Sequence, residues 1–317
     1  MTVPGLAVVM AVRNEEENLK GAVNAVIAQE VAGEIEICIA VAPSDDRTWE
    51  LANDLARRHH SIKVILNQKG TTSAGLNAAI GATSASVIAR IDGHSEPEPG
   101  YLRRAVEVLE RTGAVNVGGV FSPRGSTRFE NVVGLAMSSR FGAGNARFHY
   151  GGDEGPIDSV PFGVFQREAI EGVGLFDETL LRNQDYELNW RLREAGGIVW
   201  FDPSLRVSYR PRGSIGALAR QYVQYGWWKR VVLRRHPRSL RWRQVVPPAT
   251  VLGVFCGFLL APWWPILLTL PAAYAASVVI GSMIVGSRPS EVGVLLAVFP
   301  TMHLSWGIGF LVGVVRD

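Results

Sequence analysis

The feature that most limits how this chain can fold is a run of 44 residues, 244–287, without a single Asp, Glu, Lys or Arg. As one straight helix this run would extend about 66 Å, roughly twice the hydrocarbon core of a bilayer, so two passes fit better than one. The segment Pro262-Trp263-Trp264-Pro265 divides it, since proline interrupts a helix and tryptophan suits the membrane interface. A second uncharged run, 292–315, raises the prediction to about three transmembrane helices.

The net charge of +3 hides a strong asymmetry along the chain. Residues 1–202 hold 19 basic and 27 acidic side chains, whereas residues 203–243 hold 11 arginines and lysines and no acid. A basic block directly before an apolar span marks the cytoplasmic side and attracts anionic lipid headgroups. We therefore expect a multi-pass protein of the cytoplasmic membrane whose first two hundred residues face the cytosol. Nucleic acid would also suit a basic block, but the adjoining span argues against it.

The first 92 residues alternate short apolar runs with helical patterns. Strands are expected at 6–12, 35–41, 62–66 and 87–91, and helices at 15–29, 48–58 and 73–82. This spacing predicts a parallel sheet with helices on both faces, the first helix being capped by Asn14. The glycine-rich stretch 141–155 is long for a connection and fits a flap over a site. The predicted domains are a cytosolic domain at 1–212, interfacial helices at 213–243 and a membrane domain at 244–317.

The tripeptide Asp92-Gly93-His94 follows the strand expected at 87–91. A carboxylate and an imidazole at the carboxyl end of a strand are suited to hold a divalent cation against a phosphate. Because Asp-Gly is also a common turn signal, the tripeptide alone supports a turn without chemistry equally well.

Four segments in this order resemble the family 2 glycosyltransferases, which are inverting enzymes that use nucleotide sugars. They are residues 8–16, residues 44–48, residues 67–77 together with 90–94, and residues 183–191. The combination of Asp-Gly-His with residues 221–229 and 303–307 looks most like the membrane-bound succinoglycan type of exopolysaccharide assembly. The resemblance implies an α/β fold, namely a Rossmann-like GT-A domain that binds a nucleotide sugar, followed by an α-helical membrane domain.

The resemblance also implies roles for particular residues. Contact with the nucleotide-sugar donor is expected at Ala11, Val12, Arg13, Glu15, Asp45, Asp46, Asn77 and Arg90. Asp92 and His94 would hold a divalent cation, Mn²⁺ or Mg²⁺, and Asp185 would be the catalytic base. Contact with the acceptor or the membrane interface is expected at Gln184, Gln221, Trp227 and Trp228.

Three departures from the family pattern affect these expectations. Val41 and Ala42 stand where the family has an acidic pair. This leaves open whether Asp45 or Asp46 contacts the nucleotide base of the donor. A histidine at 94 replaces the second aspartate of the metal motif and favours softer ions such as manganese. Glutamine at 184 replaces the glutamate that usually precedes the catalytic aspartate.

The function expected from these residues is transfer of a sugar from a nucleotide-diphosphate donor, expected to be UDP-linked, to a polyprenyl-diphosphate-linked saccharide in cell-surface polysaccharide assembly. A polyprenyl-phosphate sugar synthase is one alternative, and a noncatalytic sugar-nucleotide-binding scaffold of an assembly complex is another. Without the resemblance, Asp185 reads as a carboxylate at a helix end and residues 221–229 as an interfacial helix. Three spans leave little room for the channel of a processive synthase.

Overall fold

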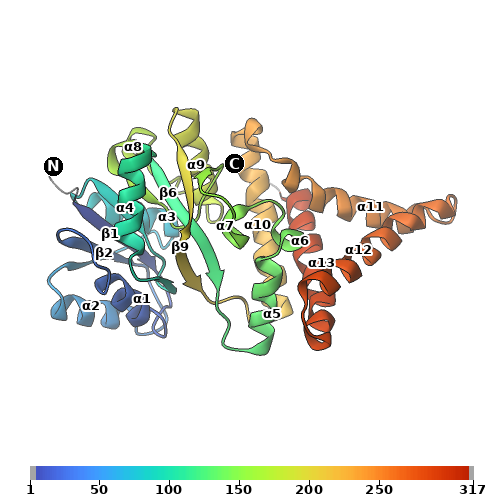
Figure 1. The fold of residues 1–317 in the computed structure, drawn as a ribbon, viewed down its shortest axis with the longest axis horizontal. Coiled ribbons are helices and arrows are strands. Elements are labelled where there is room, and N and C mark those ends of the chain that lie inside the picture. Colours follow the sequence, from blue (N-terminus) through green and yellow to red (C-terminus); the bar gives the residue numbers. More distant parts are fainter. Residues whose placement is uncertain (1–4, 314–317) are drawn as a thin grey trace. The chain divides into compact units, whose positions relative to one another are not determined.

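The computed structural model describes residues 5–313, which divide into two compact units (Figure 1). The first unit comprises residues up to 122 and residues 151–209, and the second comprises residues 123–150 and the chain from 210 onward. The sequence predicts one domain over residues 1–212. In the structure, residues 123–150 leave the first unit between two of its strands and pack with the second.

The first unit is built on a mixed sheet. Its elements are β1 (Leu6–Val12), α1 (Leu19–Ile27), β2 (Ile35–Val41), α2 (Thr48–Arg58), β3 (Ile62–Leu66), α3 (Thr72–Gly81), β4 (Val87–Arg90), β5 (Ser95–Pro97), α4 (Tyr101–Thr112), β6 (Asn116–Pro123), β7 (Gly155–Pro156), β8 (Val164–Gln166), α8 (Arg167–Gly172), α9 (Gln184–Glu194) and β9 (Val199–Tyr209). The strand order is β3-β2-β1-β4-β8-β6-β9-β5, and β7 pairs with β9.

Only part of this sheet is parallel. Strands β3, β2, β1 and β4 run parallel, as the helix crossovers between them require, whereas β8 runs antiparallel to both β4 and β6. The parallel sheet expected from residues 1–92 is therefore confirmed for β1 to β4. Beyond β4 the sheet is mixed, because no helical crossover within this unit joins β6 to β8 and nothing forces them to run parallel.

Alternating residues of the parallel strands serve two separate cores. Leu6, Val8 and Met10 of β1 face a core shared with α1, α2 and α4, whereas Ala7 and Val9 face a core shared with α3, α8 and α9. The period of two along each strand thus explains why both faces are covered by helices. The carboxyl ends of the parallel strands all open at one edge of the sheet, where ligands of such folds bind.

The first helix begins later than the sequence predicts. Asn14 has φ 54° and does not cap a helix, and the N-cap of α1 is Asn18. The reason is a competing set of bonds: the Asn14 side chain accepts from the amide of Asp45 at 2.9 Å, and the amide of Glu15 donates to Thr48 Oγ1 at 2.8 Å. Residues 14–17 therefore form a turn that is tied to the turn after β2.

The second unit is helical. It contains α5 (Arg128–Met137), α6 (Arg140–Ala143), α7 (Arg147–Tyr150), α10 (Ile215–Arg235), η1 (Pro237–Ser239), η2 (Trp242–Gln244), α11 (Val246–Leu260), η3 (Pro265–Leu268), α12 (Thr269–Val285) and α13 (Pro289–Val312). Within residues 5–313, three helical segments are long and apolar enough to cross a membrane, at 242–260, 265–285 and 289–312. The chain breaks at Pro262–Pro265 as predicted, and Val314 and Val315 of the expected third run lie outside the described residues.

Residues 123–150 are anchored along α13 (Figure 1, green against red). Arg128 Nη2 donates to Ser290 Oγ at 3.1 Å. The Phe141 ring meets the Phe299 ring edge-on at 4.8 Å, and His303 Nε2 lies 2.9 Å from the Phe141 carbonyl oxygen. The part of the predicted flap that precedes residue 151 is thus packed on membrane-length helices, and His303 has a packing role there.

Helices α10 and α13 cross at two glycines. A Cβ atom on Gly226 would overlap the carbonyl oxygen of Trp306, and one on Gly309 would overlap the carbonyl oxygen of Val223. Small residues at such crossings let two helix backbones approach closely. Arg230 Nη1 then donates to the carbonyls of Phe310 and Leu311, at 3.0 and 2.9 Å, in the last turn of α13. That turn would otherwise leave its carbonyls without partners.

Glu130 is a buried carboxylate at the start of α5 that accepts several bonds. Its Oε2 accepts from the amides of Ser126 and Thr127 at 2.7 and 3.0 Å, and its Oε1 accepts from Arg210 Nε at 2.9 Å. Burial alone would raise the pKa of Glu130, but these bonds outweigh it and lower the pKa from 4.5 to about 2.

This shift predicts an acid-sensitive contribution to stability. Because the folded-state pKa lies below the unfolded one, the contribution is full above pH 4.5 and is lost as the pH falls from 4.5 towards 2. Wild-type protein in detergent should therefore lose more thermal stability over this range than Glu130→Gln, measured as the unfolding midpoint against pH. Glu107→Gln on the exposed face of α4 is the control, and its unfolding midpoint should fall with pH as that of the wild type does. Identical acid limbs for wild type and Glu130→Gln would contradict the prediction.

Candidate active site

Three turns at the carboxyl edge of the parallel strands are bonded to one another. The turn after β1 and the turn after β2 exchange bonds in both directions: the amide of Glu16 donates to Asp46 Oδ2 at 3.1 Å, and the amide of Arg47 donates to Glu16 Oε2 at 3.1 Å. Glu15 links the first turn to the turn after β4, since its Oε1 lies 2.7 Å from His94 Nδ1. The edge is thus one connected surface built from separate strand ends.

Gly93 allows the turn after β4 to pack against the turn after β1. A Cβ atom at this position would stand 2.7 Å from Val12 Cγ1 and 3.2 Å from Glu15 Cγ. These approaches are closer than ordinary van der Waals contact, so a side chain here would push His94 away from Glu15. The glycine of Asp92-Gly93-His94 is therefore required by space, because it lets the two turns pack together.

Arg90 joins Asp92 to Asp185, which lies 95 residues further along the chain. Its Nε and Nη2 donate to the two oxygens of Asp92 at 3.0 and 3.2 Å, and its Nη1 donates to Asp185 Oδ1 at 2.5 Å. The Arg90 side chain is 5% exposed, whereas those of Asp92 and Asp185 are 19% and 23% exposed. The two carboxylates therefore reach the surface of the edge while the cation between them is buried.

This arrangement shifts the pKa of both partners of the Arg90–Asp185 pair. Burial raises the pKa of Asp185, the Arg90 charge opposes that rise, and the Asp92 charge adds to it, so the pKa lies above the ordinary value. Burial disfavours the charge on Arg90, but the two carboxylates outweigh it and hold the pKa of the guanidinium above its ordinary value. Asp185 is thus a carboxylate poised to accept a proton more readily than an exposed aspartate.

The start of α9 places Asp185. Asn183, the N-cap, has φ 61°, a left-handed conformation that asparagine tolerates better than most residues. Gln184 is 7% exposed and Asp185 follows in the first turn, where the positive end of the helix favours a carboxylate. Asp185 does lie at a helix end, as the sequence alone indicates. The same position brings its carboxylate to Arg90.

The structure separates the roles of Asp45 and Asp46. Asp46 Oδ1 accepts from the amide of Thr48 at 3.0 Å and from Thr48 Oγ1 at 2.5 Å, while Oδ2 accepts from the amide of Glu16. These bonds outweigh the effect of burial and lower the pKa of Asp46. Asp45 is exposed, and its side chain accepts one long bond, from Asn14 Nδ2 at 3.4 Å. Asp46 builds the turn, which leaves Asp45 as the carboxylate available to a ligand.

Two alanine variants test this division. Asp45→Ala should weaken nucleotide binding with little change in the unfolding midpoint, because an exposed carboxylate with one long bond adds little to stability. Asp46→Ala should lower the unfolding midpoint as well as the affinity, because it leaves the amides of Thr48 and Glu16 without their acceptor. Calorimetric titration with nucleoside diphosphate and a thermal melt measure the two quantities. The reverse result, with Asp46→Ala stable and Asp45→Ala unstable, would contradict the assignment.

The remaining residues expected at the donor site and at the acceptor interface fall into three groups. Ala11 and Val12 end β1, and Arg13 is exposed beside them at the carboxyl edge. Asn77 on α3 holds the backbone of Phe176, donating to its carbonyl at 2.8 Å and accepting from its amide at 3.0 Å. The expected interface residues belong to α10 of the second unit: Gln221, whose Nε2 donates to Tyr225 at 2.7 Å, and the tryptophans Trp227 and Trp228.

The residues at Asp92 fit a divalent cation that is shared with a ligand. Arg90 uses one acceptor position on each Asp92 oxygen, and each carboxylate oxygen has a second. His94 adds an imidazole, a donor suited to Mn²⁺. Among residues 5–313, no group of three or more His, Cys, Asp or Glu side chains is arranged to hold a metal. A cation at Asp92 and His94 would therefore need further oxygen ligands, such as those of a diphosphate.

Sequence reasoning missed the residues that support the site. Asn14 and Thr48 tie two turns together, and Phe162, Phe176 and Tyr101 surround or support Arg90. Asn14 and Thr48 lie inside the motifs that were recognised, so their hydrogen-bonding side chains were a usable signal. The aromatic residues read as ordinary core, and nothing in the sequence distinguishes them.

Parallel strands in the order 3-2-1-4, with polar turns bonded together at their carboxyl edge, define a Rossmann-like domain of the GT-A type. The model of glycosyl transferase family 2 matches residues 7–174, more than half of the chain, and the chain belongs to this family.

Two relatives show the kinds of protein this chain is similar to. The succinoglycan biosynthesis protein ExoA of Rhizobium meliloti is 28% identical over 277 residues, which cover 86% of this chain and 84% of that protein. A dolichyl N-acetyl-alpha-D-glucosaminyl phosphate 3-beta-D-2,3-diacetamido-2,3-dideoxy-beta-D-glucuronosyltransferase of Methanococcus voltae is 24% identical over 215 residues, 65% of this chain and 67% of that protein.

Solved structures agree on the fold. The mannosyltransferase PcManGT of Pyrobaculum calidifontis, in complex with GDP-Man and Mn²⁺, superposes with a TM-score of 0.64 at 16% identity. The match covers 98% of this chain and 87% of the mannosyltransferase chain. GalNAc-T7 with UDP, GalNAc and Mn²⁺ superposes with a TM-score of 0.52 at 16% identity. The match covers 75% of this chain and 51% of the GalNAc-T7 chain. At these identities the likeness concerns the fold.

Proposed function

We propose that this glycosyltransferase moves a sugar from a nucleoside-diphosphate donor, with inversion, to a polyprenyl-diphosphate-linked saccharide at the cytosolic face of the cytoplasmic membrane. The observation that carries the proposal is the meeting of Asp92 and Asp185 on Arg90 at the carboxyl edge of the sheet. A carboxylate with a raised pKa beside a second carboxylate that fits a diphosphate-bound cation is the equipment that this reaction needs.

The chemistry assigned to Asp185 is that of a general base. The acceptor hydroxyl oxygen forms a bond to the anomeric carbon while the bond from that carbon to the diphosphate oxygen breaks, and the electron pair leaves with the diphosphate. The hydroxyl proton passes to Asp185, whose Oδ1 is held by Arg90. A positioned base typically contributes about 10²- to 10⁴-fold to such a step.

The donor is assigned to the bonded turns of the first unit. Asp45 and Arg13 are exposed at the two turns that would meet the base and ribose, and the backbone at Ala11 and Val12 ends the strand beneath them. Asp92 and His94 would hold Mn²⁺ or Mg²⁺, which would neutralise charge on the departing diphosphate. The names of two structural neighbours, which include GDP-Man, UDP and Mn²⁺, support this choice of ligand.

The acceptor is assigned to the membrane side of the molecule. The three membrane-length segments and the basic residues of 203–243 suit a lipid-linked substrate and anionic headgroups. Trp227, Trp228 and Gln221 on α10 are the residues proposed to contact it, and Gln184 is proposed next to the base. The names of the relatives, one in succinoglycan biosynthesis and one acting on a dolichyl-linked phosphosugar, support an acceptor of this class.

The test is release of nucleoside diphosphate by the full chain in lipid, across UDP- and GDP-sugars with Mn²⁺, with and without lipid extract. Turnover on one donor that lipid extract stimulates is the expected result. The product should keep its new bond in mild acid; an acid-labile glycosyl phosphate would instead identify a polyprenyl-phosphate sugar synthase. Saturable donor binding without turnover under every lipid condition would identify a noncatalytic scaffold and contradict the proposal.

A further inference from the structure

We infer that Arg90 is a positioning residue that fixes Asp185 relative to Asp92, in place of the donor contact expected from its motif. The inference rests on the proposed function for the reaction itself. It depends on the bonds of the guanidinium, on the rings beside it and on the backbone that holds those rings.

The bonds of Arg90 leave it little freedom to reach a ligand. Three of its N–H groups donate to Asp92 and Asp185, and its side chain is 5% exposed. The two parallel bonds to Asp92 form a bidentate pair, which fixes the plane of the guanidinium as well as its position. The third bond then fixes Asp185 in relation to that plane. Two N–H groups remain, one on Nη1 and one on Nη2, but a side chain that is 5% exposed offers them little access to a diphosphate.

Two aromatic rings restrict the guanidinium further. The Cζ atom of Arg90 lies 5.8 Å from the centre of the Phe162 ring and 5.9 Å from that of the Phe176 ring. Both distances are within the range at which a cation is attracted to the face of a ring. The rings stand in place of water around the charge, which strengthens the bonds of the buried cation to its carboxylates.

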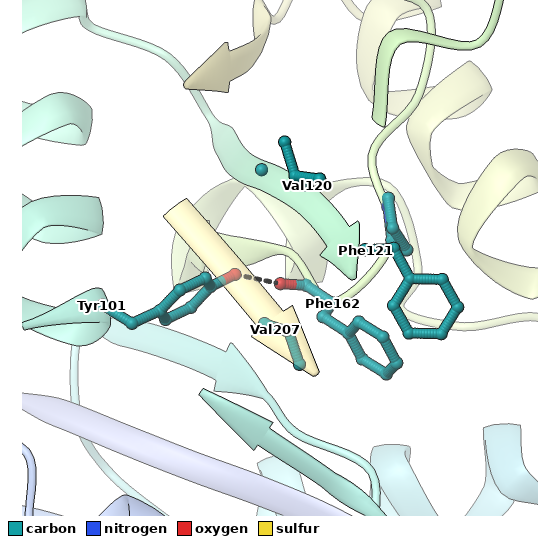
Figure 2. Close-up of a pocket in the computed structure, with 7 residues that line it drawn as sticks. Tyr101, Val120, Phe121, Phe162 and Val207 are labelled. Atoms are coloured by element: carbon teal, nitrogen blue, oxygen red, sulfur yellow. Dashed lines mark hydrogen bonds between the residues drawn. The ribbon is translucent and has the colours of Figure 1, made fainter. Parts of the chain in front are cut away.

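Each ring is held from a different helix. Tyr101 at the start of α4 is 3% exposed and donates from its hydroxyl to the Phe162 carbonyl at 3.0 Å, as Figure 2 shows. Asn77 on α3 bonds both the carbonyl and the amide of Phe176. The Phe121 ring packs beside Phe162, with ring centres 4.9 Å apart. The surroundings of Arg90 are thus fixed from both faces of the sheet.

Left-handed backbone gathers around the same point. Among residues 5–313, the non-glycine residues with positive φ are Asn14, Phe162, Leu175 and Asn183. Phe162 carries one of the rings, Leu175 precedes the other ring residue, and Asn183 lies two residues before Asp185. Such conformations persist where the surrounding structure enforces them and are found at functional sites. Phe162 and Leu175 therefore carry strain beside the two rings, and Asn183 supplies a conformation that asparagine tolerates before Asp185.

A lysine at 90 would keep the positive charge but lose the bidentate geometry. Arg90→Lys should therefore lower kcat by about 10²-fold, the loss that a misplacement of about 1 Å produces, and change the donor KM and the affinity for nucleoside diphosphate far less than kcat. The matched control is Arg103→Lys on the exposed face of α4, which should match wild type in all three quantities. Weaker nucleotide binding by Arg90→Lys with unchanged kcat would overturn the inference and place Arg90 on the diphosphate.

A double-mutant cycle separates positioning from a direct contact. If Arg90 acts through Asp185, Arg90→Lys causes no further loss of rate in an Asp185→Asn enzyme. An additive loss would overturn the inference. Should Arg90→Lys fail to fold, Asp185→Glu supplies the second variant, because it displaces the carboxylate while Arg90 stays in place; the same fall in kcat at unchanged KM is expected, and wild-type kcat would overturn the inference.

Hydrogen exchange gives a result that does not depend on turnover. Arg90→Lys should speed exchange of the amides in the first turn of α9, residues 184–187, and Arg103→Lys should not. If the wild type turns over no donor, the proposed function fails, yet this measurement still decides whether Arg90 fixes Asp185. Unchanged exchange in that turn would overturn the inference whatever the activity.

Discussion

Replacing Asp185 by asparagine is expected to lower the rate of sugar transfer by about 10²- to 10⁴-fold while the donor still binds. Asparagine keeps the shape of the side chain and an oxygen for Arg90 Nη1, but it cannot take the acceptor proton. The loss should therefore appear in kcat and leave the donor KM nearly constant. Nucleoside diphosphate release in lipid measures the rate, and calorimetric titration measures binding.

Asp54→Asn is the matched control for this change. Asp54 lies on α2 and pairs with Arg57 of the same helix, so its replacement should leave both kcat and KM at the wild-type values. Normal transfer by Asp185→Asn that still binds donor would contradict the role of Asp185 as the base. It would favour an acceptor that is already ionised, such as a lipid phosphate.

Replacing Gly309 by alanine is expected to destabilise the second unit strongly. The new methyl group would overlap the carbonyl oxygen of Val223 and lie 2.9 Å from its Cα atom, and a backbone cannot move aside as a side chain can. Overpacking of this kind costs about 1–3 kcal/mol. We therefore expect a lower yield of folded protein and a lower unfolding midpoint in detergent. Gly226→Ala should behave in the same way, since its methyl group would overlap the Trp306 carbonyl on the other side of the crossing.

Gly293→Ala on the same helix is the control. Within residues 5–313, no atom beyond the adjoining backbone of α13 lies within 4 Å of a Cβ placed at Gly293, so the substitution adds no clash and removes a residue that disfavours helix by about 0.5–1 kcal/mol. Gly293→Ala should thus raise the unfolding midpoint, whereas Gly309→Ala should lower it. Equal effects at 293 and 309 would show that the tight crossing does not contribute to stability.

The parallel half of the sheet and the three membrane-length segments follow from patterns within the sequence. Strands β1 to β4 occupy apolar runs that end in polar turns. The break after α11 lies at Pro262 and Pro265. The pairing of the antiparallel strands could not be predicted from these patterns, because it depends on contacts between distant segments. The start of α1 was wrong for a similar reason: its capping asparagine bonds a turn 31 residues away instead of its own helix.

The sequence predicts the residue types of the candidate site but not the bonds among them. Four motifs named Asp92, His94 and Asp185, but no local pattern shows that Arg90 bonds two of the three. Asp45 and Asp46 look alike in the sequence, and only the bonds made by Asp46 separate them. Asn77 lies in a recognised segment yet holds Phe176, because its partner is 99 residues away.

The path of residues 123–150 has a consequence for how the protein is made. These residues leave the ribosome between two strands of the sheet, but α13, on which Arg128 and Phe141 pack, is the last described helix to be synthesised. Until α13 is made, the contacts of Arg128 with Ser290 and of Phe141 with Phe299 therefore cannot form. A chain that stops after α10, designed to give a water-soluble catalytic fragment, would leave the segment permanently in that condition.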